Sequence, residues 1–184
     1  MTRTTRSIAA LALLGGLALA PPAGAEEPFT ACSADWGSLP ETSPMPEIPA
    51  ALTDVRSGEH TCFDRLVIDL GDAADVGYDV RYVDEITDPV SGEVTELRGA
   101  ADLKITVRAT IDGTAEHPPY DPAQPDEIID VSDEGVFRQA ALAWDYEGAT
   151  TVGLGVRARL PMRTLLLEDP DGGARLVVDV ARSW

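Results

Sequence analysis

Apolar side chains occupy every second position in several short stretches of this chain. In the stretch from Leu103 to Arg108, leucine, isoleucine and valine alternate with lysine, threonine and arginine. Because successive side chains of a strand point to opposite faces, this pattern predicts a strand with one buried and one solvated face. Alternating or β-branched runs of this kind predict strands over residues 65–70, 78–83, 103–111, 137–146, 151–157, 162–167 and 175–180.

Turn residues separate the predicted strands. Asp112-Gly113 suits a tight turn, and the run from Asp169 to Gly173 suits a hairpin connection. Residues 114–130 are rich in proline and acidic residues, which predicts a long exposed loop. Residues 135–142 contain alanines that also favour helix, but we prefer a strand there. The pattern as a whole predicts an all-β fold, a two-sheet β-sandwich of about seven to nine strands.

One six-residue pattern occurs twice, as RLVIDL at residues 65–70 and as RLVVDV at residues 175–180. In both copies the aliphatic residues at alternate positions share one face, which we assign to the core. The similarity is either a coincidence of β-rich composition or a sign that the two strands pair. If they pair antiparallel with Val67 opposite Val177, oppositely charged residues face each other at both ends. This hypothesis predicts two cross-strand ion pairs, Arg65–Asp179 and Asp69–Arg175.

The N-terminus has the features of a secretory signal peptide over residues 1–25. Arg3 and Arg6 precede an apolar stretch from residue 8 to residue 20, and Ala23-Gly24-Ala25 supplies small residues for cleavage. The apolar stretch is too short to span a bilayer. We therefore expect a secreted protein, with no membrane insertion after cleavage.

Residues 26–59 are rich in proline, serine and glutamate, which predicts an arm or linker, and residues 60–184 are predicted to form the folded domain. The chain has two cysteines, Cys32 and Cys62, and an exported protein most often pairs them. In the chain-entropy description, such a bond across about 30 residues stabilises the fold by roughly 3.6 kcal/mol. The disulfide would fasten the arm to the first predicted strand.

The chain is strongly acidic, with 32 aspartates and glutamates, 14 lysines and arginines, and a formal net charge of −18. Such a charge repels phosphate backbones and anionic lipid surfaces, so nucleic acid is excluded as a partner. Oxygen ligands crowded near the acidic loop suit calcium, but a solvated loop is favoured because charge runs are normally wet. The candidate calcium ligands are Asp121, Asp126, Asp130 and Asp133, with Glu127 and Glu134 nearby.

Groups for catalysis are few. The only two histidines are His60, beside the expected disulfide, and His117, in the acidic loop. No serine has a nucleophile-elbow context, and no Walker motif, zinc-ligand spacing or Cys-x-x-Cys is present. Carboxylates are so abundant that no one pair indicates a glycosidase. We therefore expect a non-catalytic protein without a cofactor.

Aromatic residues and scarce arginines are the candidates for ligand binding. Alternation places Tyr78 with Tyr82, and Trp144 with Tyr146, on single strand faces, and aromatic residues in strands usually belong to the core. Arginines suit the carboxylates of an acidic ligand, although ion pairing within the protein is the alternative. The candidate ligand-binding residues are Tyr78, Arg81, Tyr82, Trp144, Arg157 and Trp184.

The order of motifs over residues 60–184 resembles the AMIN-like domain of exported proteins from high-GC Gram-positive bacteria. The motifs are Asp64–Val67, Gly77-Tyr78, Arg81–Asp84, Gly99, Leu103, Glu147-Gly148, Gly153–Gly155, Asp169-Pro170 and Leu176–Val180. Two departures are a longer final hairpin and the lack of a lipoprotein cysteine directly after the apolar stretch.

The AMIN-like family is similar in turn to the AMIN domain, a β-sandwich that binds peptidoglycan. The resemblance therefore implies a sandwich in a cell-wall-associated protein whose partner is peptidoglycan or an envelope protein. The alternative is an acidic, calcium-stabilised extracellular interaction module.

Overall fold

The computed structural model describes residues 32, 35–71, 75–169 and 172–184, so the predicted signal peptide lies outside the described residues. Twelve strands and one 3-10 turn, η1, form this part of the chain. Their bounds are β1 (Glu41–Ser43), β2 (Ala50–Glu59), β3 (Phe63–Gly71), β4 (Tyr78–Val83), β5 (Ile86–Thr87), β6 (Val94–Thr95), β7 (Ala101–Val107), β8 (Ala109–Thr110), η1 (Pro125–Glu127), β9 (Phe137–Tyr146), β10 (Ala149–Val156), β11 (Met162–Glu168) and β12 (Ala174–Ala181).

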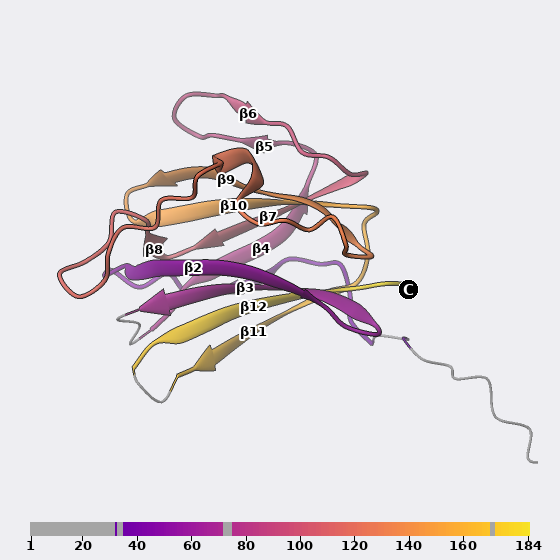
Figure 1. Ribbon diagram of the computed structural model, residues 1–184, viewed down its shortest axis with the longest axis horizontal. Helices are drawn as coiled ribbons and strands as arrows, with labels where there is room; N and C mark the ends of the chain where they lie inside the picture. Colours follow the sequence, from indigo (N-terminus) through magenta and orange to yellow (C-terminus); the bar gives the residue numbers. More distant parts are fainter. Residues whose placement is uncertain (1–31, 33–34, 72–74, 170–171) are drawn as a thin grey trace, which may run out of the picture. The chain divides into compact units, whose positions relative to one another are not determined.

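Ten of these strands form two five-stranded sheets that pack face to face (Figure 1). Sheet A has the order β1-β4-β7-β10-β9, and sheet B has the order β11-β12-β3-β2-β8. β5 and β6 form a small separate hairpin. The predicted all-β sandwich is confirmed. The strands outnumber the expected seven to nine because β1, β5, β6 and β8 are too short to show a period.

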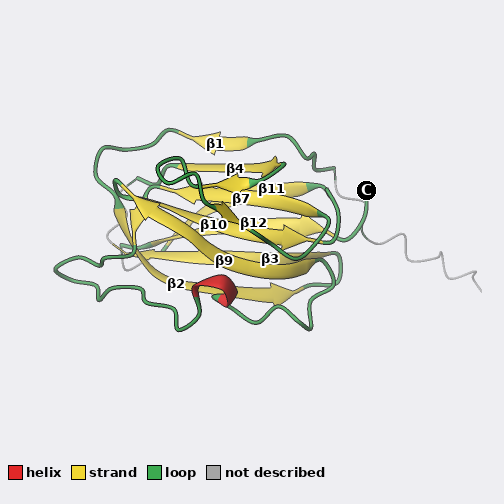
Figure 2. Ribbon diagram, turned by 90° about the horizontal axis from the view of Figure 1, so that it is seen from above, coloured by secondary structure: helices red, strands yellow, loops and turns green. Residues whose placement is uncertain are grey.

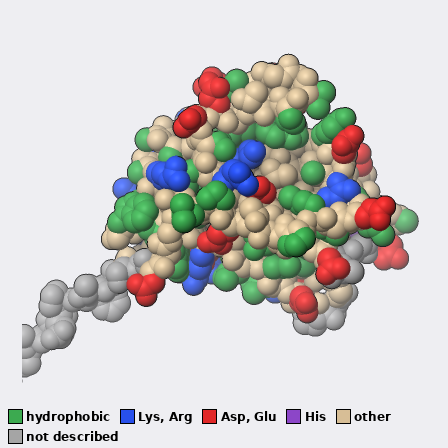
Figure 3. All heavy atoms as spheres, turned by 180° about the vertical axis from the view of Figure 1, so that it is seen from behind, with side chains coloured by type: hydrophobic (Ala, Val, Ile, Leu, Met, Phe, Trp, Pro, Cys, Tyr) green, Lys and Arg blue, Asp and Glu red, His purple; other side chains and the backbone are tan. Residues whose placement is uncertain are grey.

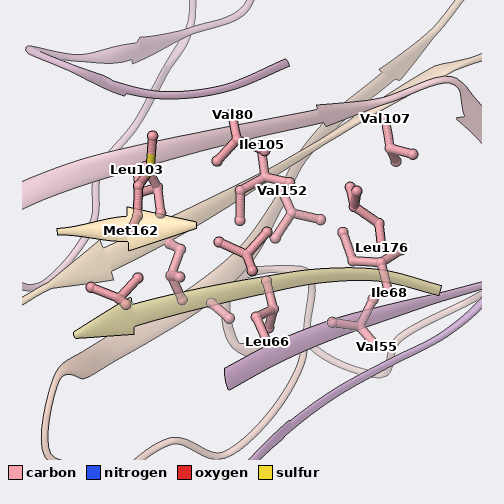
Figure 4. Packing of buried hydrophobic residues seen from close by; sticks show 14 of the residues in the cluster. Val55, Leu66, Ile68, Val80, Leu103, Ile105, Val107, Val152, Met162 and Leu176 are labelled. Atoms are coloured by element: carbon pink, nitrogen blue, oxygen red, sulfur yellow. The ribbon is translucent and has the colours of Figure 1, made fainter. Parts of the chain in front are cut away.

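The core lies between the two sheets, where their aliphatic faces meet (Figure 4). Val80, Ile105 and Val152 come from sheet A, and Ile68 and Leu176 come from sheet B. All five are fully buried. Alternation along each strand thus delivers one apolar face per sheet, and burial of these faces is the main favourable free energy of folding.

All seven predicted strands are present, and the strand over residues 137–146 has the bounds expected for it. The alternative helix over residues 135–142 is wrong, because β9 pairs with β10 along its length. The predicted strand over residues 103–111 is divided: Arg108 separates β7 from β8, and its N–H donates to the carbonyl of Gly77. Pairing between strands therefore overrides the helix propensity of alanine.

The arm expected over residues 26–59 differs from the structure over its second half, where residues 41–43 and 50–59 form strands of the sandwich. β2 pairs with β3 and places Leu52 and Val55 in the core. Two features explain why the sequence pattern did not predict this strand. The prolines at positions 44, 46 and 49 lie between β1 and β2, and a register shift between Leu52 and Asp54 interrupts the alternation.

The register proposed for the repeated pattern is confirmed, because β3 and β12 are antiparallel with Val67 opposite Val177. One of the two predicted ion pairs forms: Arg65 donates to both carboxylate oxygens of Asp179, at 2.6 and 2.9 Å. The other prediction is wrong, because both partners have nearer alternatives. Asp69 accepts from Arg56 on β2 at 2.7 and 3.0 Å, and Arg175 pairs with Asp169 at 2.6 Å.

The carboxylate of Asp179 is completely buried and also accepts from Arg163 on β11, at 2.8 Å. The Arg163 guanidinium lies 4.2 Å from the ring centroid of Trp36. The expected disulfide between Cys32 and Cys62 is present and holds the segment that carries Trp36 beside the start of β3. Arg65 and Arg163 thus compensate the buried charge of Asp179 on the outer face of sheet B, and the Trp36 ring packs against Arg163.

The chain between β4 and β7 crosses the outer face of sheet A. Ile86 is fully buried there, although it lies outside the sandwich core. A Cβ at Gly153 would lie 3.0 Å from Ile86, and a Cβ at Gly155 would collide with the carbonyl oxygen of Arg98. The Gly-x-Gly of β10 therefore has a packing role, since it lets the crossing chain approach the sheet closely.

Gly155→Ala tests this close approach. We expect the free energy of unfolding to fall by about 1–3 kcal/mol, because the backbone at Arg98 must shift to admit the methyl group. Gly58→Ala on β2 is the matched control, since a Cβ there would meet nothing within 4 Å; its stability should be unchanged or raised by less than about 1 kcal/mol. Chemical denaturation measures both, and equal effects would contradict the packing role.

Asp179→Ala tests the buried ion pair. Removing the carboxylate leaves Arg65 and Arg163 without their shared partner, so we expect a loss of about 3–5 kcal/mol. Arg56→Ala, which breaks the more exposed pair with Asp69 on the same face, should cost about 1 kcal/mol or less. Urea unfolding of the two variants compares them directly, and a loss at Asp179 no larger than at Arg56 would refute the interpretation.

Candidate ligand-binding groove

A groove of about 470 Å³ opens where β4 ends and β7 begins. Three parts of the chain form it: the end of β4 and the residue after it, the segment that leads into β7, and the connection between β10 and β11. The lining residues are Tyr82, Val83, Asp84, Leu97, Gly99, Ala100, Ala101, Asp102 and Arg159. The groove thus combines an aromatic ring, an arginine, two carboxylates and a floor of small residues.

Tyr82 forms a fixed wall of the groove. Its ring packs against the core, and its hydroxyl donates to the carbonyl of Leu160 at 2.9 Å and accepts from the N–H of Leu160 at 3.1 Å. Burial raises the pKa of the phenol. A hydroxyl that is held at both ends and kept neutral orients the ring and is not suited to proton transfer.

Arg159 is the basic group of the groove. Its guanidinium lies 5.2 Å from the ring centroid of Tyr82, and it donates to the carbonyl of Ser38 at 2.9 Å and to the Ser38 hydroxyl at 3.2 Å. These contacts fix the exposed guanidinium. Within the part of the chain that the structure describes, Arg159 has no ion pair with a carboxylate.

Most other arginines differ from Arg159 in this respect, because each forms an ion pair with an acidic residue. They are Arg56, Arg65, Arg81, Arg98, Arg163, Arg175 and Arg182. Basic side chains on the face shown in Figure 3 accordingly lie scattered among acidic and apolar ones. Arg159 therefore retains a positive charge that an external carboxylate can compensate.

Trp184 lies next to this arginine. Its indole N–H donates to the backbone carbonyl of Arg159 at 3.1 Å, while 69% of the residue stays exposed to solvent. An exposed ring held by one hydrogen bond offers an apolar face for stacking.

The carboxylates of the groove give it an acidic side. Burial, and secondarily the charge of Glu96, raises the pKa of Asp102 above its ordinary value of 3.8. Asp84 follows β4 directly and also lines the groove. A ligand with both an acidic and a basic group therefore finds partners for both here.

Of the six residues predicted to bind a ligand, the structure places Tyr82 in the lining of the groove and Trp184 in a hydrogen bond with the backbone of Arg159. The remaining four lie elsewhere. Tyr78 packs against the core, where burial raises its pKa, and Arg81 pairs with Asp79. Trp144 on β9 lies opposite Thr151 on β10. Arg157 donates to the backbone carbonyl of Arg182.

Arg159, the basic residue of the groove, was not among the residues predicted from the sequence. It lies outside any strand, in the connection between β10 and β11, where no periodicity indicates which way a side chain points. Its two anchors come from Ser38 and Tyr82, which are remote in the sequence. Only the assembled fold shows that none of the described acidic residues pairs with this arginine.

The acidic residues considered for calcium are not assembled into a site. Asp130 accepts from the N–H of Ser132 at 2.9 Å, which lowers its pKa, and Glu127 pairs with Arg98. Across residues 35–71, 75–169 and 172–184, no three acidic, histidine or cysteine side chains form a group that could hold a metal ion. The loop is also less exposed than expected, because Tyr120, Ile128 and Ile129 pack against the core.

The two histidines lie in separate places. The His60 ring stacks on Phe63 with the centroids 4.5 Å apart, and His117 approaches the backbone at Gly71. Neither histidine lines the groove.

Comparison with known proteins gives one match. A family model described as the AMIN-like domain matches residues 50–182, which is most of the chain. This match includes β2, although the sandwich in the structure also includes β1, which lies before the matched residues. No curated protein and no solved structure matches the chain. Among the described residues, no helix is long and apolar enough to cross a membrane.

Asp102→Asn tests the electrostatics of the groove. Because the folded-state pKa of Asp102 is raised, its ionisation opposes folding as the pH rises above its unfolded pKa. The variant should therefore melt at a higher temperature than the wild type at about pH 7, and the difference should vanish near pH 3, where the carboxyl is protonated in both states. Differential scanning calorimetry measures it. A difference independent of pH would contradict the assigned cause.

Proposed function

The chain belongs to the AMIN-like domain family, and from this premise we propose that it is a secreted module that binds peptidoglycan through the groove beside Arg159. Members of this family are generally non-catalytic binding modules of the cell envelope. The signal-peptide pattern of residues 1–25 supports export. Binding without catalysis is also consistent with a groove whose tyrosine hydroxyl is already hydrogen-bonded twice.

The observation that carries the proposal is the exposed Arg159 guanidinium, which is held in place by Ser38 and Tyr82 and has no acidic partner among the described residues. Peptidoglycan consists of sugar chains with short peptides that end in carboxylates. A guanidinium forms two parallel hydrogen bonds with a carboxylate, and one that is already oriented loses little side-chain entropy on binding. The stem peptide therefore supplies the group that Arg159 lacks.

The neighbouring aromatic ring extends the recognition to the glycan. Trp184 is exposed and is hydrogen-bonded to the backbone of Arg159, so a sugar next to the bound carboxylate can stack on the indole. The acidic side of the groove, Asp84 and Asp102, can accept hydrogen bonds from sugar hydroxyls or from a stem-peptide amine. The ligand therefore needs a carboxylate and a sugar in proximity, as muropeptides have.

The acidity of the protein makes this local arrangement important. With a formal net charge of −18, the protein as a whole repels anionic polymers, so attraction operates only at short range. Binding should rely on contacts inside the groove rather than on long-range steering.

Co-sedimentation with purified peptidoglycan tests the proposal. Arg159→Glu should raise the apparent Kd about tenfold or more, because it replaces the pairing charge with a repelling one, and Trp184→Ala should weaken binding through loss of stacking. Arg138→Ala is the matched arginine control, since Arg138 donates only to backbone carbonyls on β9 and before it. Tyr146→Ala is the exposed aromatic control, with 50% of the residue accessible. Both controls should bind as the wild type does.

Two outcomes would refute the proposal. Binding that is unchanged by Arg159→Glu and Trp184→Ala would exclude the groove. Release of soluble fragments from labelled peptidoglycan by the wild-type protein would show catalysis instead of binding alone.

A further inference from the structure

A short length of open strand edge lies on β11, the border strand of sheet B. β1, the border strand of sheet A, lies on the same side of the sandwich (Figure 2). The N-terminal segment covers the first half of the β11 edge: the N–H of Met162 donates to the carbonyl of Gly37 at 2.7 Å, and the N–H of Thr164 donates to the Glu41 carboxylate at 2.6 Å.

The second half of the same edge has no such cover. In an antiparallel pair, every second residue directs its N–H and C=O away from the partner strand. Met162 and Thr164 do so on β11, and hence Leu166 and Glu168 do so as well. Among the described residues, no acceptor is bonded to the N–H of either Leu166 or Glu168. Sheets normally block such edges, because unpaired backbone groups attract other strands.

A second groove, of about 420 Å³, adjoins this open edge. Leu166 and Glu168 form one side, and the turn after β1 forms the other, with Met45 between two prolines. Leu166 is 39% exposed and Met45 is 45% exposed, so an apolar surface faces solvent beside the unpaired backbone. Asp75 and Glu168 give the groove two carboxylates.

We propose that this edge binds an extended segment of a partner protein, which adds to sheet B as one further strand next to β11. The segment would exchange backbone hydrogen bonds with Leu166 and Glu168 and place an apolar side chain beside Met45. A lysine or arginine next to that side chain would pair with Glu168 or Asp75. The partner is therefore an extended peptide with alternating apolar residues and at least one basic residue.

Charge distinguishes this occupant from a second copy of the chain. Two copies joined through their β11 edges would bring Glu168 of each near the other, and each copy carries a formal net charge of −18. A basic segment meets the same carboxylates with the opposite sign, and so charge complementarity favours it. This site uses none of the residues that line the groove beside Arg159.

Fluorescence anisotropy with a labelled peptide, acetyl-Lys-Val-Thr-Val-Lys-Val-Thr-Lys-amide, tests the proposal on the protein that begins at Glu26. We expect saturable binding of the peptide. Methylating the peptide nitrogens at alternate residues should abolish binding in one register and leave it in the other, because only one edge of the added strand faces β11. Glu168→Lys should raise the Kd about tenfold or more. Glu93→Lys, at an exposed position before β6, should change it less than about twofold.

The result that would overturn the proposal is a Kd insensitive to Glu168→Lys or to both methylation registers, or no binding of the peptide at all. Dimerisation of the wild type that Glu168→Lys changes, measured by light scattering, would identify a second copy as the occupant and would also overturn it. Arg159→Glu should leave peptide binding unaltered, so that the failure of either proposal can be recognised separately.

Discussion

The antiparallel pairing of β3 with β12 is the interaction on which the rest of this structure depends. It joins the early part of the domain to its last strand and forms the centre of sheet B. Its inner face supplies aliphatic residues to the core, and its outer face carries the buried Asp179 with two arginines. A slip of one residue would exchange these two faces, so the buried carboxylate and the core together specify the register.

That pairing also fixes the position of the C-terminus. A short N-terminal segment, residues 35–41, contacts both proposed sites. Trp36 covers Arg163, Ser38 holds Arg159 of the groove, and Glu41 caps the β11 edge. The disulfide from Cys32 to Cys62 begins this series of contacts. The segment predicted to be an arm fastened by the disulfide therefore also packs along the open side of the sandwich, and it decides which parts of the surface stay accessible.

The sequence predicted those features of the fold whose signal lies in the sequence pattern itself. Seven strands, the disulfide and the register of Val67 opposite Val177 could be predicted, because alternation and a repeated pattern are properties of the sequence itself. The partners of Asp69 and Arg175 could not, since Arg56 on β2 and Asp169 at the final hairpin pair with them instead. β2 was missed because prolines precede it and a bulge breaks its period.

The candidate groove was harder to predict, because its residues come from separate parts of the chain and share no local sequence pattern. Tyr82 and Trp184 were among six candidates, but the residue that unites them lies in a connection without periodicity. The decisive property of Arg159 is that the described residues give it no acidic partner, and this can be recognised only when the carboxylates and arginines around it have been placed. Arg108, Arg138 and Arg157 also form no ion pair among the described residues. The indication of a ligand at Arg159 therefore comes from the combination of an unpaired guanidinium with Tyr82 and Trp184 beside it.

The same charge balance explains how one small sandwich can keep two binding surfaces distinct. Most of the described basic side chains are paired with carboxylates, and Arg159 is an unpaired one that lines a groove, so an anionic ligand can find a partner there. A basic peptide is attracted by the acidic surface in general, but it finds unpaired backbone groups beside apolar side chains at Leu166 and Glu168. Arg159 favours a ligand with a carboxylate, whereas the β11 edge favours a basic segment, so the two surfaces prefer different ligands. The two proposed sites thus allow one domain to bind peptidoglycan on one surface and a protein segment on the other.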